Sequence, residues 1–405
     1  MYENLTLIGG FLLVYSLVAG GVERTRVSGP IIFTAFGLLI GPMVFDLHSM
    51  EIDGDVICSL AEVTLAVVLF TDAAGADVRI LKRFGGIPAR MLLIGLPLTI
   101  LLGVGVAVLL IEDQPILLLA LLATMLAPTD AALGKAVVSN KAIPSEIRES
   151  LNVESGLNDG ICVPILLAFL ELAHGASGEA QPLGLVVKLL VEEIGIGLAV
   201  GLGVTWIAVK LFRSAQVRGW STKTWMQLSV AALAITCFSL AQYLGGSGFI
   251  AAFAGGLLVA FMGHKHAKVM HEEVLVSSEG ASDALALVTW VLFGSAVVGQ
   301  LVEHLTWLIL LYSILSLTVI RMVPVFVSLW GSGVDTEGKL FLGWFGPRGL
   351  ASIVFMVLIV NSGMPDTGPL VATASCTIVL SILAHGITAN PWARGYARRR
   401  SKVKA

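Results

Sequence analysis

Five ionisable residues stand inside long apolar stretches of the 405-residue chain: Asp130, Glu154, Asp159, Arg321 and Arg348. Charges are scarce in this chain, which is 56% hydrophobic and 13% charged. An ionisable group at the centre of a bilayer costs roughly 2.5–3.5 kcal/mol on insertion scales, and such groups usually mark ion or proton pathways with a partner close by. The pattern therefore indicates a route for ions or protons across a membrane.

The segment 152-NVESGLNDGICVP-164 holds most of the candidate ligands. On a helix, side chains four positions apart are neighbours. Glu154 and Asn158 therefore share one face, and Ser155 and Asp159 share the adjacent face. The segment is expected to present a hydroxyl and a carboxylate together, with a second carboxylate and an amide beside them.

One carboxylate in this segment can serve two ligands. A hard monovalent cation prefers several oxygen ligands, and Asp159, Ser155 and the carbonyl and hydroxyl of Thr129 can supply them. A proton binds the same Asp159 carboxylate, so the two ligands exclude each other, which is sufficient for exchange. Gly156 and Gly160 form a pair of small residues that lets another helix approach.

Arg321, in 313-SILSLTVIRMVPVF-326, needs an anionic partner at membrane depth. A buried guanidinium group is best met by a hydrogen-bonded carboxylate. We expect Glu154 to be that partner, in a pair whose charge stays fixed while Asp159 changes state. A simpler interpretation is that Glu154 and Asp159 only neutralise Arg321 and Arg348. It explains the charge count but not the Ser, Thr and Asn oxygens around Asp159.

Two prolines interrupt apolar segments next to charged residues. The stretch 124-TMLAPTDAAL-133 contains Pro128, and 343-GWFGPRGLAS-352 contains Pro347. Proline disfavours helix at the preceding residue and removes a backbone donor. Irregular backbone at membrane depth is tolerated only where it is buried in protein or lines a cavity. Broken helices that cross in opposite directions are typical of a transporter's substrate site; two ordinary proline kinks are the alternative.

Thirteen apolar segments approach the length of about 20 residues that spans a bilayer. They cover residues 4–22, 28–45, 55–71, 91–111, 115–134, 148–172, 183–211, 224–244, 248–263, 279–300, 305–330, 339–361 and 368–388. The expected fold is an all-α polytopic membrane protein with about 13 transmembrane helices. It would contain inverted repeats and two crossed discontinuous helices, spans 5 and 12, which lie seven spans apart.

The basic residues predict the orientation of these spans. With the N-terminus outside and the C-terminus inside, 22 of the 25 Lys and Arg residues fall in inside segments. Only Lys188 lies near the outside, and Arg321 and Arg348 lie within the membrane. This asymmetry follows the positive-inside rule. We therefore expect a multi-pass protein of the cell (inner) membrane, whose basic tail 389–405 is cytoplasmic and contacts anionic lipid.

Other polar features receive simpler interpretations. Asp72 and Asp77 precede the basic residues near 79–83 at an inside helix end, and we interpret them as solvated charges, with a cation-attracting funnel as the alternative. The four cysteines lie in apolar runs without a CxxC pair and indicate neither a disulfide nor a metal centre. No cofactor and no nucleic-acid partner is expected.

Taken together, three motifs resemble those of a known family. They are 154-ESGLND-159, 128-PTD-130, and 346-GPRG-349 with Arg321 one helix earlier. Over most of its length the chain resembles the monovalent cation/proton antiporters, in the NhaP/NHE-like sodium–proton exchanger branch. The resemblance implies 13 helices, a six-helix ion-carrying core and a homodimer.

The resemblance also assigns roles to the site residues. It implies that Asp159 binds the cation together with Ser155 and Thr129. Asp130 would assist them directly or through water. Asn158 is grouped with these cation- and proton-binding residues. It implies a structural ion pair between Glu154 and Arg321, and Arg348 is the core charge near a broken helix. The electrogenic branch has an aspartate at the position of Asn158, so the resemblance implies electroneutral one-for-one exchange.

These roles lead to a division of the chain. We expect N-terminal scaffold or dimer helices, a first half of the ion-carrying core, a linking helix, further scaffold helices, a second half of the core and the basic tail. In that order they cover residues 1–90, 91–172, 183–211, 224–300, 305–388 and 389–405.

The expected function is secondary transport, not enzymatic catalysis. The chain would exchange Na⁺, with Li⁺ and K⁺ as alternatives, for H⁺ and so contribute to pH homeostasis. A K⁺/H⁺ antiporter on the same scaffold is one competing hypothesis. An intramembrane aspartyl protease using Asp130 and Asp159 is another, although Asp159 follows Gly156-Leu157-Asn158 and not the usual Gly-x-Gly. A cation channel is a third, but no filter sequence is visible.

Overall fold

A computed structural model describes residues 2–22, 25, 27–42, 54–75, 86–111, 113–130, 133, 137, 143–177, 183–220, 222–263, 268–298, 301 and 304–404. In this part of the chain every regular element is a helix. The first half contains α1 (Tyr2–Val22), α2 (Gly29–Ile40), α3 (Gly54–Gly75), α5 (Gly86–Arg90), the π-helical turn η1 (Met91–Gly95), α6 (Leu96–Leu110), α7 (Ile116–Met125) and α9 (Ser145–Ser177). Then follow α10 (Leu183–Val217), α11 (Lys223–Tyr243), α12 (Gly248–Gly263), α13 (Lys268–Phe293), the π-helical turn η2 (Gly294–Val298), α15 (Trp307–Leu317), α16 (Val319–Ser328), α17 (Thr336–Trp344), α18 (Leu350–Asn361) and α19 (Gly368–Lys404).

Each of the 13 apolar segments expected from the sequence contains an apolar helix. Among the described residues, six helical stretches are long and apolar enough to cross a membrane, and seven further apolar helices are shorter. The protein is thus an all-helical, multi-pass membrane protein, and the number of crossings remains a prediction. Helix α9 and helix α10 both extend beyond the predicted spans, by a turn or so at their ends.

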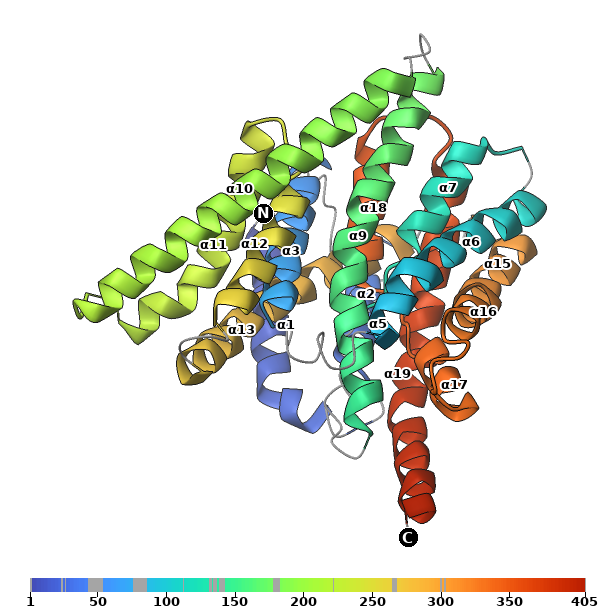
Figure 1. Ribbon diagram of the computed structural model, residues 1–405. Helices are drawn as coiled ribbons and strands as arrows, with labels where there is room; N and C mark the ends of the chain where they lie inside the picture. Colours follow the sequence, from blue (N-terminus) through green and yellow to red (C-terminus); the bar gives the residue numbers. More distant parts are fainter. Residues whose placement is uncertain are drawn as a thin grey trace.

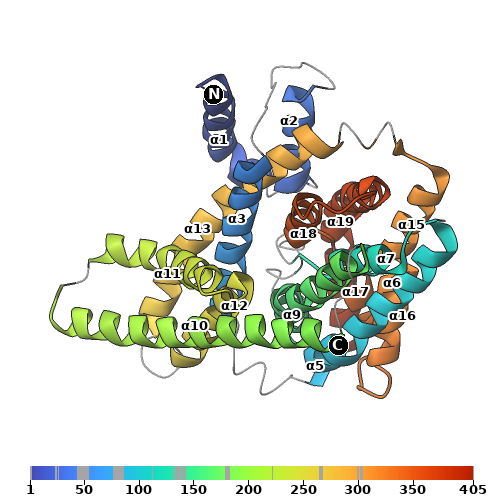
Figure 2. The ribbon, with the colours of Figure 1, turned by 90° about the horizontal axis from the view of Figure 1, so that it is seen from above.

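The helices form two groups that meet at α9. Seen from above (Figure 2), α3 and α10–α13 lie on one side, and α5–α7 and α15–α19 lie on the other. Helix α9 packs against α7 in the second group and also contacts α3 and α12 in the first. Figure 1 shows α9 and α18 near the middle of the molecule, while α19 extends past the other helices to the C-terminus. The candidate site residues on α9 therefore lie between the two groups.

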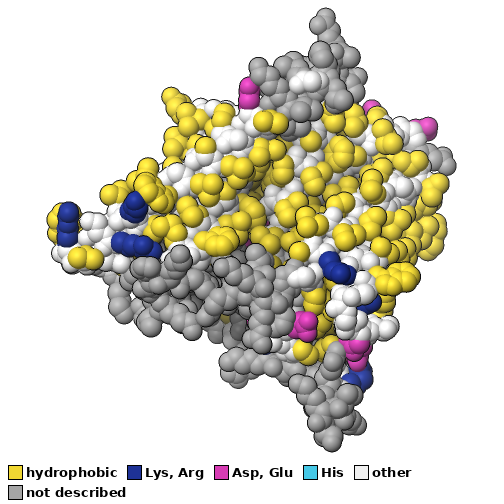
Figure 3. Space-filling model, viewed as in Figure 1, with side chains coloured by type: hydrophobic (Ala, Val, Ile, Leu, Met, Phe, Trp, Pro, Cys, Tyr) yellow, Lys and Arg dark blue, Asp and Glu magenta, His cyan; other side chains and the backbone are white. Residues whose placement is uncertain are grey.

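The outer surface is apolar over a broad face. Figure 3 shows hydrophobic side chains in a broad band across the coloured part of this face, with the few Lys, Arg, Asp and Glu side chains mostly around it. On α10, Leu202, Trp206 and Leu211 are among the exposed apolar side chains. Such an exposed apolar band is the surface that lipid chains solvate.

Both predicted interruptions are present as breaks in helical structure. Helix α7 ends at Met125, and residues 126–130 are not helical. Helix α17 ends at Trp344, and residues 345–349 separate it from α18. Most of the second half of span 5, beyond Asp130, lies outside the described residues.

Two features differ from the sequence-based segments. Residues 305–330 were expected as one helix, but Thr318 divides α15 from α16 with φ −113° and ψ −90°. Its hydroxyl donates to the carbonyl of Ile314 at 2.7 Å, a contact that bends helices. The tail 389–405 was expected only as a basic end, whereas α19 continues as a helix to Lys404.

Candidate functional site

The two interrupted segments meet at their breaks. The N–H of Asp130 donates to the carbonyl of Pro347 at 2.8 Å, and the hydroxyl of Ser352 donates to the carbonyl of Met125 at 2.8 Å. The carboxylate of Asp130 accepts the N–H of Leu350, the first residue of α18, at 3.0 Å. A carboxylate at this place caps the helix and complements the positive end of its dipole. Asp130 is therefore tied to the second break.

Arg348 performs the reciprocal function for the first break. Its side chain is completely buried, and Nη1 donates to the carbonyls of Ala127 at 2.8 Å and Pro128 at 3.2 Å, just beyond the end of α7. A cation there complements the negative end of a helix dipole. Gly349 is required at this crossing because a Cβ atom there would overlap the carboxylate of Asp130. Each break thus supplies a charge to the helix end of the other.

Glu154 and Arg321 form a two-pronged ion pair in the interior. Arg321 Nη1 lies 2.8 Å from Glu154 Oε1, and Nη2 lies 2.9 Å from Oε2. The two side chains are 1% and 3% exposed. Glu154 Oε1 also accepts from Asn158 at 3.2 Å, and Oε2 accepts from the Thr129 hydroxyl at 3.4 Å. Both carboxylate oxygens of Glu154 therefore have hydrogen-bond partners, so we do not expect this carboxylate to bind a cation.

Asn158 and Thr129 connect the first break to α9. The Asn158 side chain accepts the N–H of Thr129 at 3.3 Å and donates to the Thr129 hydroxyl at 2.7 Å. The Ser155 hydroxyl donates to the Thr129 carbonyl at 2.5 Å. Because Asn158 and Glu154 engage the Thr129 hydroxyl, we expect the Ser155 hydroxyl, which shares a helix face with Asp159, and the Thr129 carbonyl to be the oxygens that could assist Asp159. The Asn158 amide thus holds the break to α9, and its grouping with the cation- and proton-binding residues stays a prediction.

Asp159 is the carboxylate with unused capacity. It is 7% exposed, and its Oδ1 is buried without a hydrogen-bond partner in the described part of the structure. The negative charges of Asp130, Asp72 and Glu154 act on it. A buried carboxylate oxygen without a partner is costly. The geometry therefore fits a site that is completed by a proton or a cation.

The small residues of α9 lie against the other helix group. A Cβ atom on Gly156 would come within 3.7 Å of the Asp72 side chain on α3, and one on Gly160 would come within 2.7 Å of the Phe253 ring on α12. Asp72 is exposed near the end of α3, as expected of a solvated charge at a helix end, and its negative charge also acts on Asp159. Asp77, interpreted with it, lies outside the described residues. Only the packing of α3 on α9 identifies Asp72, since its sequence context carries no such signal.

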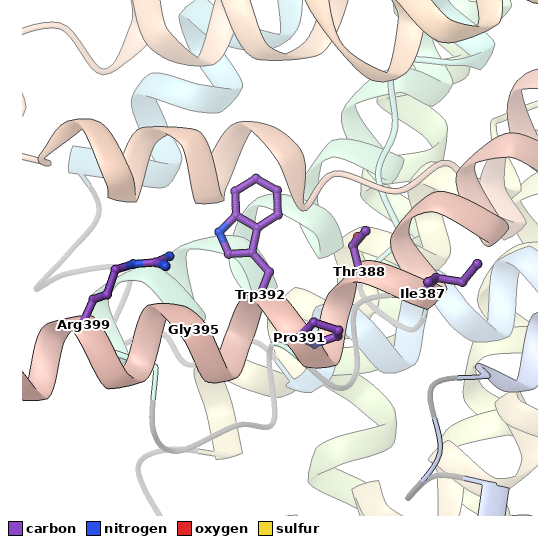
Figure 4. A pocket seen from close by; sticks show the side chains of 6 residues that line it. All are labelled: Ile387, Thr388, Pro391, Trp392, Gly395 and Arg399. Carbon is purple, nitrogen blue, oxygen red and sulfur yellow. The ribbon is translucent and has the colours of Figure 1, made fainter.

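An open pocket of about 490 Å³ lies on the C-terminal part of α19 (Figure 4). It is lined by Ile387, Thr388, Pro391, Trp392, Gly395 and Arg399. Arg399 forms an ion pair with Glu337 at 2.5 Å. None of the candidate site residues lines this pocket, so the two features are separate.

Comparison with known proteins places the chain in a family. The family model for the transmembrane sodium/hydrogen exchanger matches residues 11–395. The K(+)/H(+) antiporter NhaP of Alkalimonas amylolytica is 26% identical over 96% of this chain and 67% of its own length. The Na(+)/H(+) antiporter 2 of Zygosaccharomyces rouxii is 24% identical over 85% and 44%. The chain thus spans about two thirds or less of the length of these curated relatives.

A solved structure shares the fold. The sodium proton antiporter MjNhaP1 from Methanocaldococcus jannaschii, at pH 8, superposes with a TM-score of 0.75 and 20% identity, over 95% of this chain and 98% of that one. At this identity the likeness concerns the fold. The family match, by contrast, extends over nearly the whole sequence and includes every candidate site residue. The chain therefore belongs to the transmembrane sodium/hydrogen exchanger family.

Proposed function

We propose that the protein is a secondary transporter that exchanges one monovalent cation, Na⁺ in the first instance, for one proton. The observation that carries this proposal is the buried, unpartnered Oδ1 of Asp159. Asp159 lies one helical turn after Ser155 on α9, and the Ser155 hydroxyl donates to the Thr129 carbonyl. These are hard oxygen donors of the kind that Na⁺ prefers. A proton neutralises the same carboxylate, so cation and proton bind alternately.

The surrounding charges support electroneutral exchange. Glu154 is neutralised by Arg321 through two hydrogen bonds, and Asn158 is an uncharged amide at the neighbouring position. Asp130 caps α18, and we assign it a constant charge through the cycle. Asp159 then carries either one cation or one proton, and the loaded site has the same charge in both directions of transport.

The cation exchanged differs among the curated relatives. The curated relatives include proteins named as K(+)/H(+) and as Na(+)/H(+) antiporters. Both ions are hard cations, and selection between them depends on the size of the site and the number of ligands. We propose Na⁺, with Li⁺ as an alternative substrate and K⁺/H⁺ antiport on the same scaffold as the second candidate function.

An intramembrane protease receives no support from this geometry. An aspartyl protease needs two carboxylates that share one proton and one water. One carboxylate oxygen of Asp130 instead accepts the N–H of Leu350, which is a structural use. The buried arginines also hold backbone carbonyls and a carboxylate, functions that such a protease does not need.

The two helix groups suggest how access alternates. We assign residues 91–172 and 305–388 to the ion-carrying core, and residues 1–90 and 224–300 to the scaffold, with residues 183–211 linking them. The glycine face of α9 against α3 and α12 is the surface along which the core would move. We place the protein in the cell inner membrane as a homodimer, with the N-terminus outside and the tail cytoplasmic, in line with the basic residues.

Transport in proteoliposomes tests the proposal. Wild-type protein should move protons when Na⁺, Li⁺ or K⁺ is added, and the order of responses identifies the substrate. Asp159→Asn should fold and give no exchange, since it keeps size and polarity but cannot titrate. Asp366→Asn is a matched control, because Asp366 is exposed and its φ of 58° suits asparagine. Exchange at the wild-type rate in Asp159→Asn would remove Asp159 from the mechanism.

A further inference from the structure

His385 is a buried imidazole that lies beside the second break and outside the cation site. It belongs to α19 and is 1% exposed. Its Nε2 is 2.8 Å from the carbonyl oxygen of Trp344, the last residue of α17. Its Nδ1 is 3.2 Å from the hydroxyl and 2.9 Å from the carbonyl of Ser381, one turn earlier on α19. Both edges of the ring are thus engaged.

The Ser381 hydroxyl determines which ring nitrogen carries the hydrogen. Its oxygen accepts the backbone N–H of Arg348 at 2.7 Å, so its own hydrogen can point to His385 Nδ1. Nδ1 then accepts, and Nε2–H donates to the carbonyl of Trp344. A neutral ring in this tautomer makes the contacts with the Ser381 hydroxyl and the Trp344 carbonyl without burying another charge, and no hydrogen lies between Nδ1 and the Ser381 carbonyl. His385 and Ser381 therefore hold the residue before the 345–349 break and the charged residue within it.

The contacts continue from Arg348 to the cation site. The Arg348 guanidinium group donates to the carbonyls of Ala127 and Pro128. The next residue, Thr129, supplies the carbonyl that accepts the Ser155 hydroxyl. A displacement of Arg348 would be transmitted over one or two residues of non-helical backbone to the Thr129 carbonyl.

We propose that His385 and Ser381 are positioning residues for cation binding. Ser381 accepts the backbone N–H of Arg348, and His385 contacts Ser381 and the Trp344 carbonyl. Together they fix the backbone at Arg348 and, through this residue, the placement of the Thr129 carbonyl. Neither residue touches the ion. The inference rests on the proposed cation/proton exchange and adds to it a requirement for two side chains on α19.

Three variants test the inference in proteoliposomes. Ser381→Ala removes the acceptor for the Arg348 N–H, and His385→Ala removes both ring contacts. His385→Gln retains an amide nitrogen that can reach the position of Nε2. Thr388→Val is the matched control, since Thr388 lies on the same helix (Figure 4). Its hydroxyl accepts from the Trp344 indole at 3.0 Å and donates to the Ala384 carbonyl at 2.6 Å. The variant loses these two side-chain hydrogen bonds but none to the backbone of residues 344–349.

A positioning role makes a specific kinetic prediction. Ser381→Ala and His385→Ala should raise the KM for the cation about tenfold, the effect of one lost buried hydrogen bond, while the maximal rate per folded molecule changes little. The double variant should resemble the single ones because the residues act in series. His385→Gln should recover much of the affinity, and Thr388→Val should keep the wild-type KM.

A purely structural role gives a different result. It would lower the amount of folded protein and the maximal rate in proportion, and leave KM unchanged. That outcome in Ser381→Ala would overturn the inference even if His385→Ala fails to fold. Absence of cation-dependent proton movement in the wild type would instead refute the proposed function, so the two failures are distinguishable.

Discussion

Loss of the Glu154 charge should destabilise the protein far more than loss of an equivalent charge at the surface. Glu154→Gln keeps the shape of the side chain but leaves Arg321, which is 2% exposed, as an uncompensated buried cation. Removing one partner of a buried ion pair costs about 3–5 kcal/mol. For a chain of this length that corresponds to a fall in melting temperature of roughly 4–6 °C.

The two partners should not be equivalent. After Arg321→Gln, the Glu154 carboxylate still accepts from Asn158 and Thr129. After Glu154→Gln, Arg321 loses its only anionic partner among the described residues, and its Nε already lacks an acceptor. Glu154→Gln should therefore be the more destabilising substitution. The double variant should recover about 2–3 kcal/mol relative to the sum of the single ones.

Melting of the purified protein in detergent measures these differences. Glu149→Gln is the control: it makes the same substitution on the same helix, in an ion pair with Arg148 whose side chains are 19% and 23% exposed. Such a pair contributes about 0–1 kcal/mol, so its melting temperature should change by roughly 1 °C or less. Equal effects of Glu149→Gln and Glu154→Gln, or strict additivity in the double variant, would refute the reasoning.

Three further predictions concern transport. Ser155→Ala should raise the KM for the cation about tenfold, since it removes one oxygen ligand; a wild-type KM would exclude Ser155 from the site. Gly160→Ala should slow exchange without changing KM, because the new Cβ would lie 2.7 Å from the Phe253 ring. Gly203→Ala is the control and should leave the exchange rate intact, because a Cβ there has nothing within 4 Å. If Asp159 alone changes charge, the rate of Na⁺ exchange should not respond to a membrane potential set by potassium and valinomycin. A steady transport current would show that a second carboxylate titrates.

The family and the all-helical fold could be predicted from the sequence, and both predictions are confirmed. Long apolar runs define helices at membrane depth, and the rare charges within them stand out for that reason. Glu154, Ser155, Asn158 and Asp159 could be assigned to two neighbouring faces because helical spacing is fixed. The ligand roles of these residues remain predictions.

Other features depend on which helices touch, and periodicity carries no such information. In the sequence, Asp72 cannot be distinguished from any other charge at a helix end. Its proximity to α9 follows only from the packing of α3 on α9. Ser381 and His385 stand four apart in an apolar run, and only the contacts with Trp344 and Arg348 give them a use. The reciprocal capping of the two breaks by Asp130 and Arg348 likewise requires the crossing itself.

The central claim is that a cation and a proton compete for the Asp159 carboxylate. Binding of the cation to purified protein in weakly buffered detergent, followed by a pH indicator and by calorimetry, tests it without a membrane or a gradient. At a pH where the carboxyl group is protonated, the wild type should release about one proton for each cation bound. Asp159→Asn should bind no cation and release no proton. Cation binding without proton release, or equal release from Asp159→Asn, would contradict the account.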